Sequence, residues 1–325
     1  MADATTHPRL RTLITGVTGF AGCYLADALS ARGESVVGLG RRPVWPAGWP
    51  NLASRVELRE CDLCNGPAVE AILRETRPER IYHLAGFARV GESFHDSEAA
   101  WSGNLTTTRR LCEAVIRCEL RSRILFVGSG AVYGKSENPE APRDEECPLR
   151  PDTPYAASKA AADLACYQYT CAPGLDIVRA RPFNHVGPLQ SADYALPNFA
   201  RQLAAIERGE VPPVLHTGNL STHRDLTDVR DMVRAYLLLM EHGRRGEAYN
   251  IGTGQTWLMQ TVLERMVSLV SLRVEIRQEA ELLRPTEQSV VRVDARKIQC
   301  ETGWKPVYSL DQTLRDTLAA WRQQR

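Results

Sequence analysis

Residues 10–22 have the sequence Leu-Arg-Thr-Leu-Ile-Thr-Gly-Val-Thr-Gly-Phe-Ala-Gly, in which an apolar run leads into a glycine loop and then a helical pattern. We expect a strand from Leu10 to Thr15 and a helix from Phe20 to Ala31. Glycines in such a turn allow a tight bend, a close approach of the backbone to a phosphate and close packing of helix on strand. The start of the helix then offers free N–H groups to an anion. The loop predicts a dinucleotide site made by Gly16, Thr18, Gly19, Phe20, Ala21 and Gly22.

Strand-like and helix-like patterns alternate through the first half of the chain. The further expected strands are 35–39, 56–58, 81–84, 124–127 and 175–180, and the further expected helices are 65–76, 98–118 and 153–170. Such alternation implies βαβ crossovers and a parallel sheet with helices on both faces. The prediction is an α/β, Rossmann-type, doubly wound parallel sheet with a smaller, partly interleaved C-terminal substrate lobe. Residues 1–181 and about 225–254 would form the dinucleotide-binding domain, and 182–224 and 255–325 the substrate lobe.

Composition excludes several other classes of protein. The chain has 325 residues with 40 basic and 39 acidic side chains, and this balance leaves no electrostatic footprint for a nucleic acid. Its longest apolar runs are too short to cross a bilayer, and the first residues lack the pattern of a signal peptide. Nine scattered cysteines are typical of reduced thiols in a cytosol. We therefore expect a cytoplasmic protein without a metal site, a nucleic-acid partner or a membrane partner.

The stretch Tyr155-Ala-Ala-Ser-Lys159 places a phenol and an ammonium one turn apart on one helix face. A ketone that is reduced develops negative charge on oxygen and needs a proton donor there. Tyr155 could donate, and a nearby Lys159 would lower the phenol pKa from its usual value of about 10. Ser129, in a glycine-flanked segment upstream, could orient the same carbonyl. Ser129, Tyr155 and Lys159 are the candidate catalytic residues, against the alternative of ordinary helix and strand-end side chains.

The end of the second strand bears on which nicotinamide cofactor is used. It has the sequence Val-Gly-Leu-Gly-Arg-Arg over residues 37–42. This segment has no acid that could hold a ribose 2′-hydroxyl. It does have two arginines, Arg41 and Arg42, that could accommodate a 2′-phosphate. NADP(H) is therefore favoured, and NAD(H) stays possible. Further cofactor contacts are expected from Asp62 and Leu63 after the third strand, and from the backbone of Leu84, Ala85 and Gly86.

Together these motifs resemble the extended short-chain dehydrogenase/reductases that act on nucleotide sugars, from about residue 10 to 320. The resemblance is carried by the glycine loop, Ser129 and Tyr155 with Lys159, and by the segments 62–63, 83–85, 181–188, 224–231 and 284–287. Within that family the chain is most similar to the GDP-4-dehydro-6-deoxy-D-mannose reductases, on segments 196–200 and 283–287.

The resemblance implies roles for further residues. Pro182 and His185 would lie near the cofactor, and Asn184 near the sugar or its phosphates. Asn104 would be a structural fourth member of the active-site network. Arg224 and Arg284 would bind the diphosphate, because a guanidinium fork suits phosphate oxygens. Glu287 would contact the substrate, a GDP-sugar.

One departure from the related 4,6-dehydratases narrows the chemistry. Those enzymes place an acid two residues after the Ser or Thr that matches Ser129, and this chain has Ala131 there. We expect NAD(P)H-dependent reduction of GDP-4-dehydro-6-deoxy-D-mannose to GDP-D-rhamnose. A nucleotide-sugar 4-epimerase with tightly bound cofactor, and a reductase of another nucleotide 4-keto sugar, stay open. A binding protein that only senses the cofactor is the third alternative, although it would not need a proton donor.

Two of the expected helices, 98–118 and 153–170, carry apolar residues on more than one side. A second apolar stripe favours a homodimer through a four-helix bundle. The residues of that stripe are Leu105, Leu111, Cys112 and Val115 on the first helix, and Leu164, Tyr167 and Tyr169 on the second. The alternative is that both helices are buried within one chain.

Overall fold

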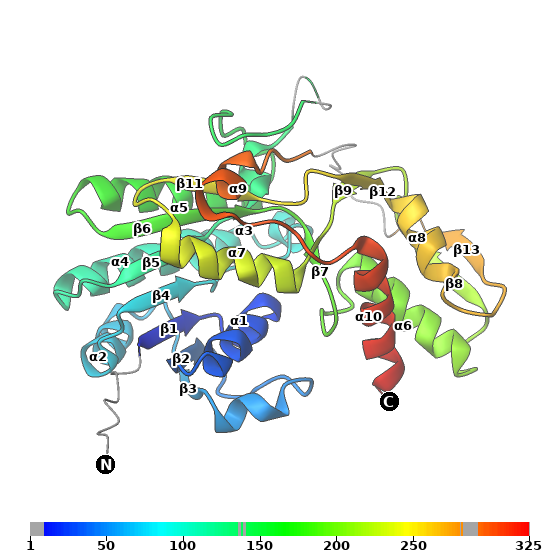
Figure 1. Ribbon diagram of the computed structural model, residues 1–325, viewed down its shortest axis with the longest axis horizontal. Coiled ribbons are helices and arrows are strands. Elements are labelled where there is room, and N and C mark those ends of the chain that lie inside the picture. Colours follow the sequence, from blue (N-terminus) through cyan, green and yellow to red (C-terminus); the bar gives the residue numbers. More distant parts are fainter. Residues whose placement is uncertain (1–9, 136–137, 139–140, 280, 282–291, 325) are drawn as a thin grey trace, which may run out of the picture. The chain divides into compact units, whose positions relative to one another are not determined.

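The computed structural model describes residues 10–135, 138, 141–279, 281 and 292–324. The chain forms two compact units, and Figure 1 labels the helices and strands that belong to them. The first unit comprises Met1–Gly128, Ser158–Arg179 and Arg244–Glu247, and the second comprises Ser129–Ala157, Ala180–Gly243 and Ala248–Arg325. These bounds place Ser129–Ala157 in the second unit. That one lobe binds the dinucleotide and the other the sugar stays a prediction.

A seven-stranded sheet with the order β11-β6-β5-β4-β1-β2-β3 underlies the fold. Its strands are β1 (Arg11–Thr15), β2 (Ser35–Gly40), β3 (Glu57–Glu60), β4 (Arg80–His83), β5 (Arg123–Val127), β6 (Asp176–Pro182) and β11 (Ala248–Ile251). Strand β1 pairs in parallel with β2 and β4, with Ile14 opposite Gly38 and Tyr82. Because the chain reverses its direction of winding at β1, the topological switch point lies beside β1. This order confirms the predicted doubly wound fold.

Helices connect these strands as the sequence predicted. In the first unit they are α1 (Phe20–Ala31), α2 (Gly66–Thr76), α3 (Ser97–Trp101), the π-helical turn η3 (Ser102–Thr106), α4 (Thr107–Arg117) and α5 (Pro154–Cys171), whose first turn belongs to the second unit; short 3-10 helices are η1 (Pro50–Ser54) and η2 (Glu92–Phe94). Asn65 caps α2 by accepting a hydrogen bond from Ala68 N at 3.2 Å. The helix predicted over 98–118 is interrupted by η3.

The core of the first unit fills the space between these helices and the sheet. Strand residues such as Ile81 and Phe126 meet helix residues there. Leu111, Cys112 and Val115 belong to the same core and are at most 1% exposed. The prediction that these three residues face a partner subunit is therefore wrong, because the sheet of their own unit already covers them. Leu105 and Tyr169 are partly buried against this core.

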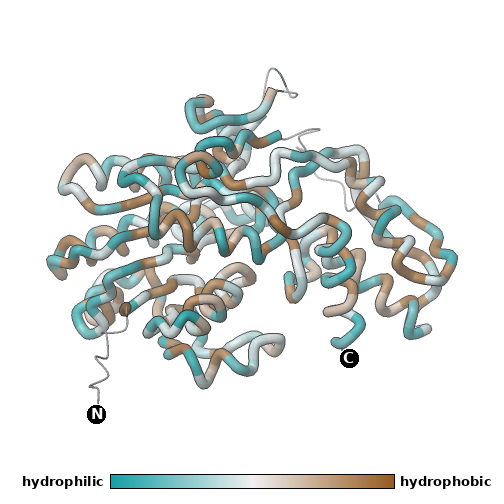
Figure 2. Tube along the Cα trace, viewed as in Figure 1, coloured by the Kyte–Doolittle hydropathy of each residue, from teal (hydrophilic) through white to brown (hydrophobic). Residues whose placement is uncertain are grey.

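The second unit contains the remaining elements. They are η4 (Gly130–Tyr133), β7 (His185–Val186), α6 (Ala195–Glu207), β8 (Val214–Thr217), β9 (His223–Asp225), β10 (Thr227–Asp228), α7 (Val229–His242), β12 (Thr256–Leu258), α8 (Met259–Val267), β13 (Glu275–Gln278), α9 (Arg296–Thr302) and α10 (Leu310–Gln323). Its small sheets pair β10 with β7, β12 with β9 and β13 with β8. A second core joins α6, α8 and α10, and hydropathy varies along each of these helices, as expected when one side faces a core (Figure 2).

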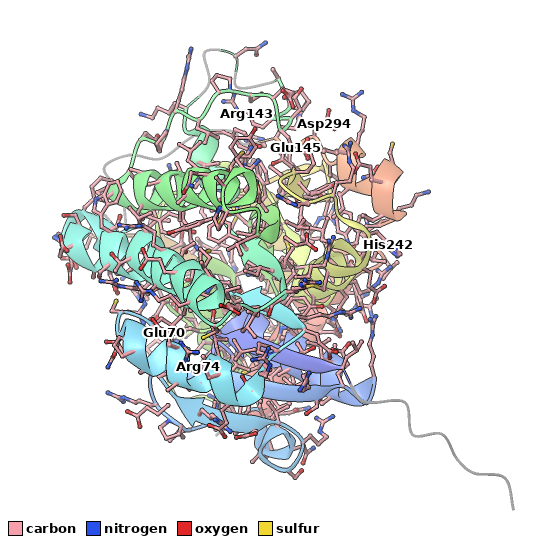
Figure 3. All side chains as sticks on the ribbon, turned by 90° about the vertical axis from the view of Figure 1, so that its left-hand side faces the viewer. Glu70, Arg74, Arg143, Glu145, His242 and Asp294 are labelled. Carbon is pink, nitrogen blue, oxygen red and sulfur yellow. The ribbon has the colours of Figure 1, made fainter. Side chains whose placement is uncertain are left out.

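Buried polar contacts fix the segment that follows η4. Arg143, Glu145 and Asp294 gather at one place in Figure 3. Asn250 of β11 donates from its main-chain N to Glu145 Oε1 at 2.7 Å and from Nδ2 to the carbonyl of Arg143 at 3.0 Å. These bonds tie the segment to the end of β11.

Within the described ranges, no helix has both the length and the apolarity that a membrane crossing requires. The same residues contain no group of three or more His, Cys, Asp and Glu side chains placed to bind a metal ion.

Candidate active site

The glycine loop forms a cradle that side chains would fill. Gly16 has φ +69°, and a Cβ on it would lie 2.7 Å from Ala85 N. A Cβ on Gly22 would collide with the carbonyls of Gly16 and Val17, so helix α1 can pack this closely only with glycine there. Gly19 is the N-cap of α1, and no described side chain caps this end.

The start of α1 therefore presents main-chain N–H groups and the positive end of the helix dipole. Thr18 lies in the loop itself, and Phe20 and Ala21 form the first turn of α1. The predicted loop residues are thus together, and they fit the pyrophosphate of a dinucleotide.

Arg41 and Arg42 follow directly on β2, and both are exposed. Neither forms a hydrogen bond or ion pair with another described residue, whereas Arg59 on β3 binds Glu75 with both terminal nitrogens at 2.7 Å. The two guanidiniums at this strand end are therefore available to an anion.

Asp62 is exposed and accepts a hydrogen bond from Cys64 N at 3.0 Å. The Leu63 side chain is part of the core, so Leu63 could reach a ligand only with its backbone.

Gly86 opens a small space at the end of β4. A Cβ on Gly86 would lie 2.5 Å from Asn104 Oδ1 and 3.1 Å from Lys159 Nζ. The neighbouring Leu84 and Ala85 are half-buried, and Ala85 N donates to Thr15 Oγ1 at 3.2 Å. The first unit thus brings Asn104 and Lys159 together beside a backbone segment that was predicted to contact the cofactor.

Lys159 is held at the end of β5. Its side chain is 6% exposed, Nζ donates to the carbonyl of Val127 at 3.0 Å, and Nζ lies 5.7 Å from the ring centre of Phe126. Burial lowers the pKa of Lys159 to about 8.

In the second unit, Ser129 and Tyr155 form a hydrogen-bonded pair. Ser129 Oγ also accepts from Ala131 N at 3.1 Å, which makes Ser129 the N-cap of η4. Burial raises the pKa of Tyr155, and the bond to Ser129 opposes that rise. Tyr155 lies in the first turn of α5, one turn before Lys159 on the same helix. The chain also joins Ser129 to Val127, the carbonyl partner of Lys159.

The segment after β6 lies against the Ser129 turn. The Phe183 ring occupies the position that a Cβ of Gly130 would need, 2.6 Å away. Pro182 is buried at the end of β6, Asn184 is exposed, and its carbonyl accepts from Thr227 N at 3.0 Å. His185 begins β7, and burial lowers its pKa. Pro182 and Asn184 flank Phe183 in the chain and so lie next to the turn that Ser129 begins, while what each predicted residue would bind stays a prediction.

Arg224 is positioned by a neighbour that the sequence analysis did not single out. Asp225 is fully buried and accepts hydrogen bonds from Thr253 N at 2.9 Å and Gly254 N at 2.7 Å. It anchors β9, in which Arg224 is half-buried and donates to the carbonyl of His223. Burial raises the pKa of Asp225 to about 6. The available signal was an acid directly after an arginine that was expected to bind the diphosphate. The predicted residues Arg284 and Glu287 lie outside the described residues.

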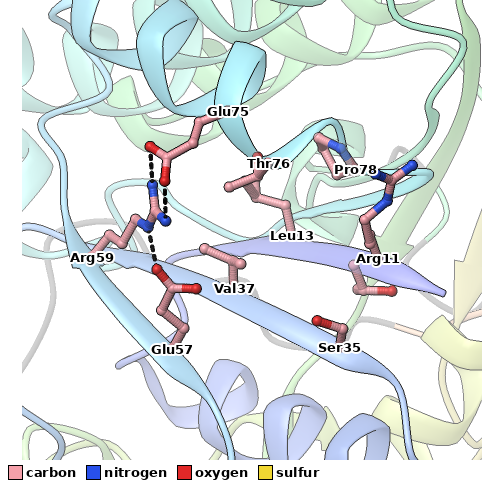
Figure 4. Close-up of a pocket in the computed structure, with 10 residues that line it drawn as sticks. Arg11, Leu13, Ser35, Val37, Glu57, Arg59, Glu75, Thr76 and Pro78 are labelled. Carbon is pink, nitrogen blue, oxygen red and sulfur yellow. Dashed lines mark hydrogen bonds and ion pairs between the residues drawn. The ribbon is translucent and has the colours of Figure 1, made fainter. Parts of the chain in front are cut away.

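One cavity of about 210 Å³ lies elsewhere in the first unit (Figure 4). Arg11 and Ser35 line it at the amino ends of β1 and β2, opposite to the strand ends that carry Gly16 and Arg41. Arg59 at its rim is paired with Glu57 and Glu75. The charges of Arg59, Glu57 and Glu75 are thus already satisfied by one another.

The family model for GDP-mannose 4,6 dehydratase matches residues 13–317. The chain belongs to the GDP-mannose 4,6 dehydratase family. Its relatives include GDP-6-deoxy-D-mannose reductase of Pseudomonas aeruginosa, which is 32% identical over 311 residues, covering 96% of this chain and 97% of the relative. This family assignment confirms the resemblance to nucleotide-sugar dehydrogenase/reductases and the expectation of an NAD(P)-dependent enzyme.

Solved structures of related proteins share the fold of this chain. The structure of RMD from Pseudomonas aeruginosa complexed with NADPH has a TM-score of 0.84 at 31% identity, covering 97% of this chain and 100% of that chain. The UDP-glucose 4-epimerase of Thermus thermophilus, in complex with NAD, has a TM-score of 0.86 at 27% identity, with the same coverage of 97% and 100%. These neighbours support a nicotinamide cofactor and leave the choice between its two forms open.

Proposed function

We propose that this protein reduces the 4-keto group of a GDP-4-keto-6-deoxy-hexose, converting GDP-4-dehydro-6-deoxy-D-mannose to GDP-D-rhamnose. The observation that carries the proposal is the turn around Ser129. Ser129 is hydrogen-bonded to Tyr155, and Ala131 occupies the position where the related dehydratases have an acid. A proton donor for a ketone oxygen is thus present, and the group that eliminates water is missing from this turn. The 32% sequence identity to a GDP-6-deoxy-D-mannose reductase, over 96% of this chain, supports the same proposal.

In the proposed reaction Tyr155 donates a proton to the sugar oxygen as negative charge develops there. Ser129 orients the carbonyl through its hydroxyl. The ammonium of Lys159 stabilises the phenolate that remains on Tyr155, and it holds the nicotinamide ribose. The bound nicotinamide cofactor supplies the hydride.

The cofactor is proposed to be NADPH. The N-terminus of α1 would hold its pyrophosphate, and Arg41 with Arg42 would hold the 2′-phosphate, because these guanidiniums have no other partner among the described residues. Pro182 and His185 would lie at the nicotinamide. NADH stays a weaker alternative.

On the substrate side, Arg224, held in place by Asp225, would bind the diphosphate together with Arg284. Asn184 and Glu287 would contact the sugar. The nucleotide is proposed to be GDP, and the protein is proposed to act in the cytoplasm.

The protein is further proposed to be a homodimer that pairs its α5 helices and the adjoining α3–α4 segments. Leu164 and Tyr167 on α5 are 57% and 50% exposed, and Trp101 at the end of α3 is also exposed. Large apolar side chains exposed on neighbouring helices are typical of a protein–protein interface.

The test is to supply the purified protein with GDP-4-dehydro-6-deoxy-D-mannose and NADPH, to follow the loss of NADPH absorbance, and to identify the sugar by NMR. Formation of GDP-D-rhamnose with stoichiometric oxidation of NADPH is expected. A 4-epimerase would instead retain bound cofactor after purification and interconvert a nucleotide sugar without added NADPH. Mass analysis of the denatured protein solution distinguishes the two, and turnover of the sugar without net NADPH oxidation would refute the reductase.

A further inference from the structure

A continuous chain of hydrogen bonds crosses the first unit from the main-chain N–H of Ala85 to the main-chain carbonyl of Asn104. Ala85 N lies 3.2 Å from Thr15 Oγ1, which lies 2.7 Å from His83 Nδ1. On the other side of the ring, His83 Nε2 lies 3.0 Å from Thr108 Oγ1, which donates to the Asn104 carbonyl over 2.6 Å. The three linking side chains are at most 1% exposed, so solvent does not compete for these bonds.

Counting donors fixes the direction of this chain and the tautomer of His83. The Thr108 hydroxyl has one hydrogen, which it gives to the Asn104 carbonyl, so it can only accept from His83 Nε2. Nε2 therefore carries a hydrogen. Thr15 accepts from Ala85 N–H, and its own hydrogen finds an acceptor at Nδ1 only if Nδ1 is unprotonated. Every donor and acceptor is satisfied for the neutral Nε2–H imidazole alone.

Burial and a nearby charge favour the same protonation state. Burial lowers the pKa of His83 to about 3, and the ammonium of Lys159 acts in the same direction. The ring thus stays neutral at physiological pH, because it is buried and lies close to the positively charged candidate catalytic lysine.

The far end of the chain is the π-helical turn η3. Asn104 lies in this turn, and its side chain accepts from Phe87 N at 3.0 Å and donates to Ser158 Oγ at 2.9 Å. Ser158 precedes Lys159 on α5. A π-turn is an unusual backbone that occurs frequently at functional sites, and it needs surrounding contacts to persist. The hydrogen bond that Thr108 donates to Asn104 O is such a contact.

We propose that neutral His83 is a positioning residue for the reaction. Through Thr15 it fixes the segment that begins at Ala85, and through Thr108 it fixes η3, so that Asn104 and Lys159 border the space at Gly86 in one arrangement. For its effect on turnover this inference rests on the proposed reductase function; the hydrogen-bond chain itself does not.

Substitutions at Thr108 test the link without removing the ring. Thr108→Val keeps the side-chain shape but leaves His83 Nε2–H without an acceptor, whereas Thr108→Ser keeps the hydroxyl. Thr107→Val is the matched control, because Thr107 lies on the same helix and bonds the Gly103 carbonyl at 2.6 Å, and within the described part of the chain it makes no hydrogen bond to His83.

NADPH binding is measured by fluorescence titration, and kcat and KM are measured with the 4-keto sugar. Thr108→Val should weaken NADPH binding or lower kcat at least about tenfold, the scale on which small displacements of positioned groups act. Thr108→Ser should stay within about threefold of the parent, and Thr107→Val should match the parent. Parent-like values for Thr108→Val, or an equal loss in Thr107→Val, would refute the proposal. If NADPH binds as expected but no 4-keto sugar is reduced, the reductase function fails and the binding measurement still decides the role of His83.

A second measurement does not depend on turnover. The protein is labelled with ¹⁵N-histidine, and long-range ¹H–¹⁵N correlation spectra assign the tautomer, with the spectrum of His83→Gln identifying the signal. The Nε2–H tautomer is expected to persist from about pH 5 to 9, because the pKa is displaced far below its usual value of about 6.5. An Nδ1–H tautomer, or titration near pH 6.5, would overturn the inference.

Discussion

Lys159 on α5 donates a hydrogen bond from Nζ to the main-chain carbonyl of Val127, 3.0 Å away at the end of β5. This bond fixes the buried ammonium of Lys159 at the carboxyl end of β5. Its acceptor, Val127, lies two residues before Ser129 in the chain. A charge held in such a place costs desolvation energy, and this cost lowers the pKa of Lys159 to about 8. The charge that the proposed reaction needs is therefore one that can be lost just above physiological pH.

The pH dependence of turnover follows from that pKa. Lys159 is charged below about pH 8 and becomes neutral as the pH rises through this value. We expect kcat to be highest below about pH 8 and to decline above it. Lys159→Arg should turn over more slowly but lose this alkaline decline, because a guanidinium stays charged. The measurement is kcat from about pH 6 to 10 at saturating substrates. A parent profile that is flat through this range would contradict the assignment.

Tyr155→Phe removes the proposed proton donor and keeps the ring. We expect the fold and NADPH affinity to be retained and kcat to fall at least about 100-fold, the usual scale of general acid catalysis. Tyr167→Phe is the control, since Tyr167 lies on the same helix and is half exposed. If Tyr155→Phe and Tyr167→Phe have similar kcat values, Tyr155 is not the donor.

Replacing both Arg41 and Arg42 with Ala should raise the KM for NADPH by at least about tenfold and change the KM for NADH little, because each charged hydrogen bond to the 2′-phosphate contributes roughly 1.5–3 kcal/mol. Arg32→Ala, at the far end of α1, controls for the loss of exposed positive charge. Equal changes for both cofactors would show that the two arginines are only solvated surface.

Arg224→Lys keeps the positive charge but loses the planar fork that binds two phosphate oxygens at once. The KM for the nucleotide sugar should rise about tenfold, with a smaller change in kcat and none in NADPH affinity. Steady-state kinetics with each substrate varied in turn separates these quantities. Unchanged KM for the sugar would remove Arg224 from the diphosphate site.

Leu164→Glu combined with Tyr167→Glu should dissociate the proposed dimer, because two charges would be buried in an apolar interface. Light scattering at micromolar concentration should give a mass near 36.2 kDa for this variant and twice that for the parent. Leu272→Glu, at a position 46% exposed in the second unit, should leave the mass of the parent unchanged. A parent that scatters as a monomer would refute the dimer.

Local sequence signals predicted the elements around the glycine loop closely. Helix α1 has the bounds expected from its pattern, and α2 with its N-cap Asn65 covers the range 65–76 that was expected. These features depend on residues a few positions apart, so the sequence carries them directly.

Features that depend on distant residues were missed. The π-turn within the helix predicted over 98–118 is held by Phe87, Ser158 and the His83 chain, and none of these bonds is visible in a local pattern. The apolar stripe of the same helix was ambiguous for a similar reason. Periodicity shows that Leu111 and Val115 share a face, but not whether their own sheet or a partner covers that face.

The burial of Lys159 has a practical consequence because lysine is scarce in this chain. The only other lysines of the sequence are Lys135, Lys297 and Lys305, and arginine supplies nearly all of the basic side chains. Labelling the side-chain nitrogen of lysine with ¹⁵N should therefore give four signals, and the signal of Lys159 should shift as the pH is raised through about 8. The protonation state of the candidate catalytic site can thus be followed by spectroscopy in the native sequence, with cofactor and sugar added in turn.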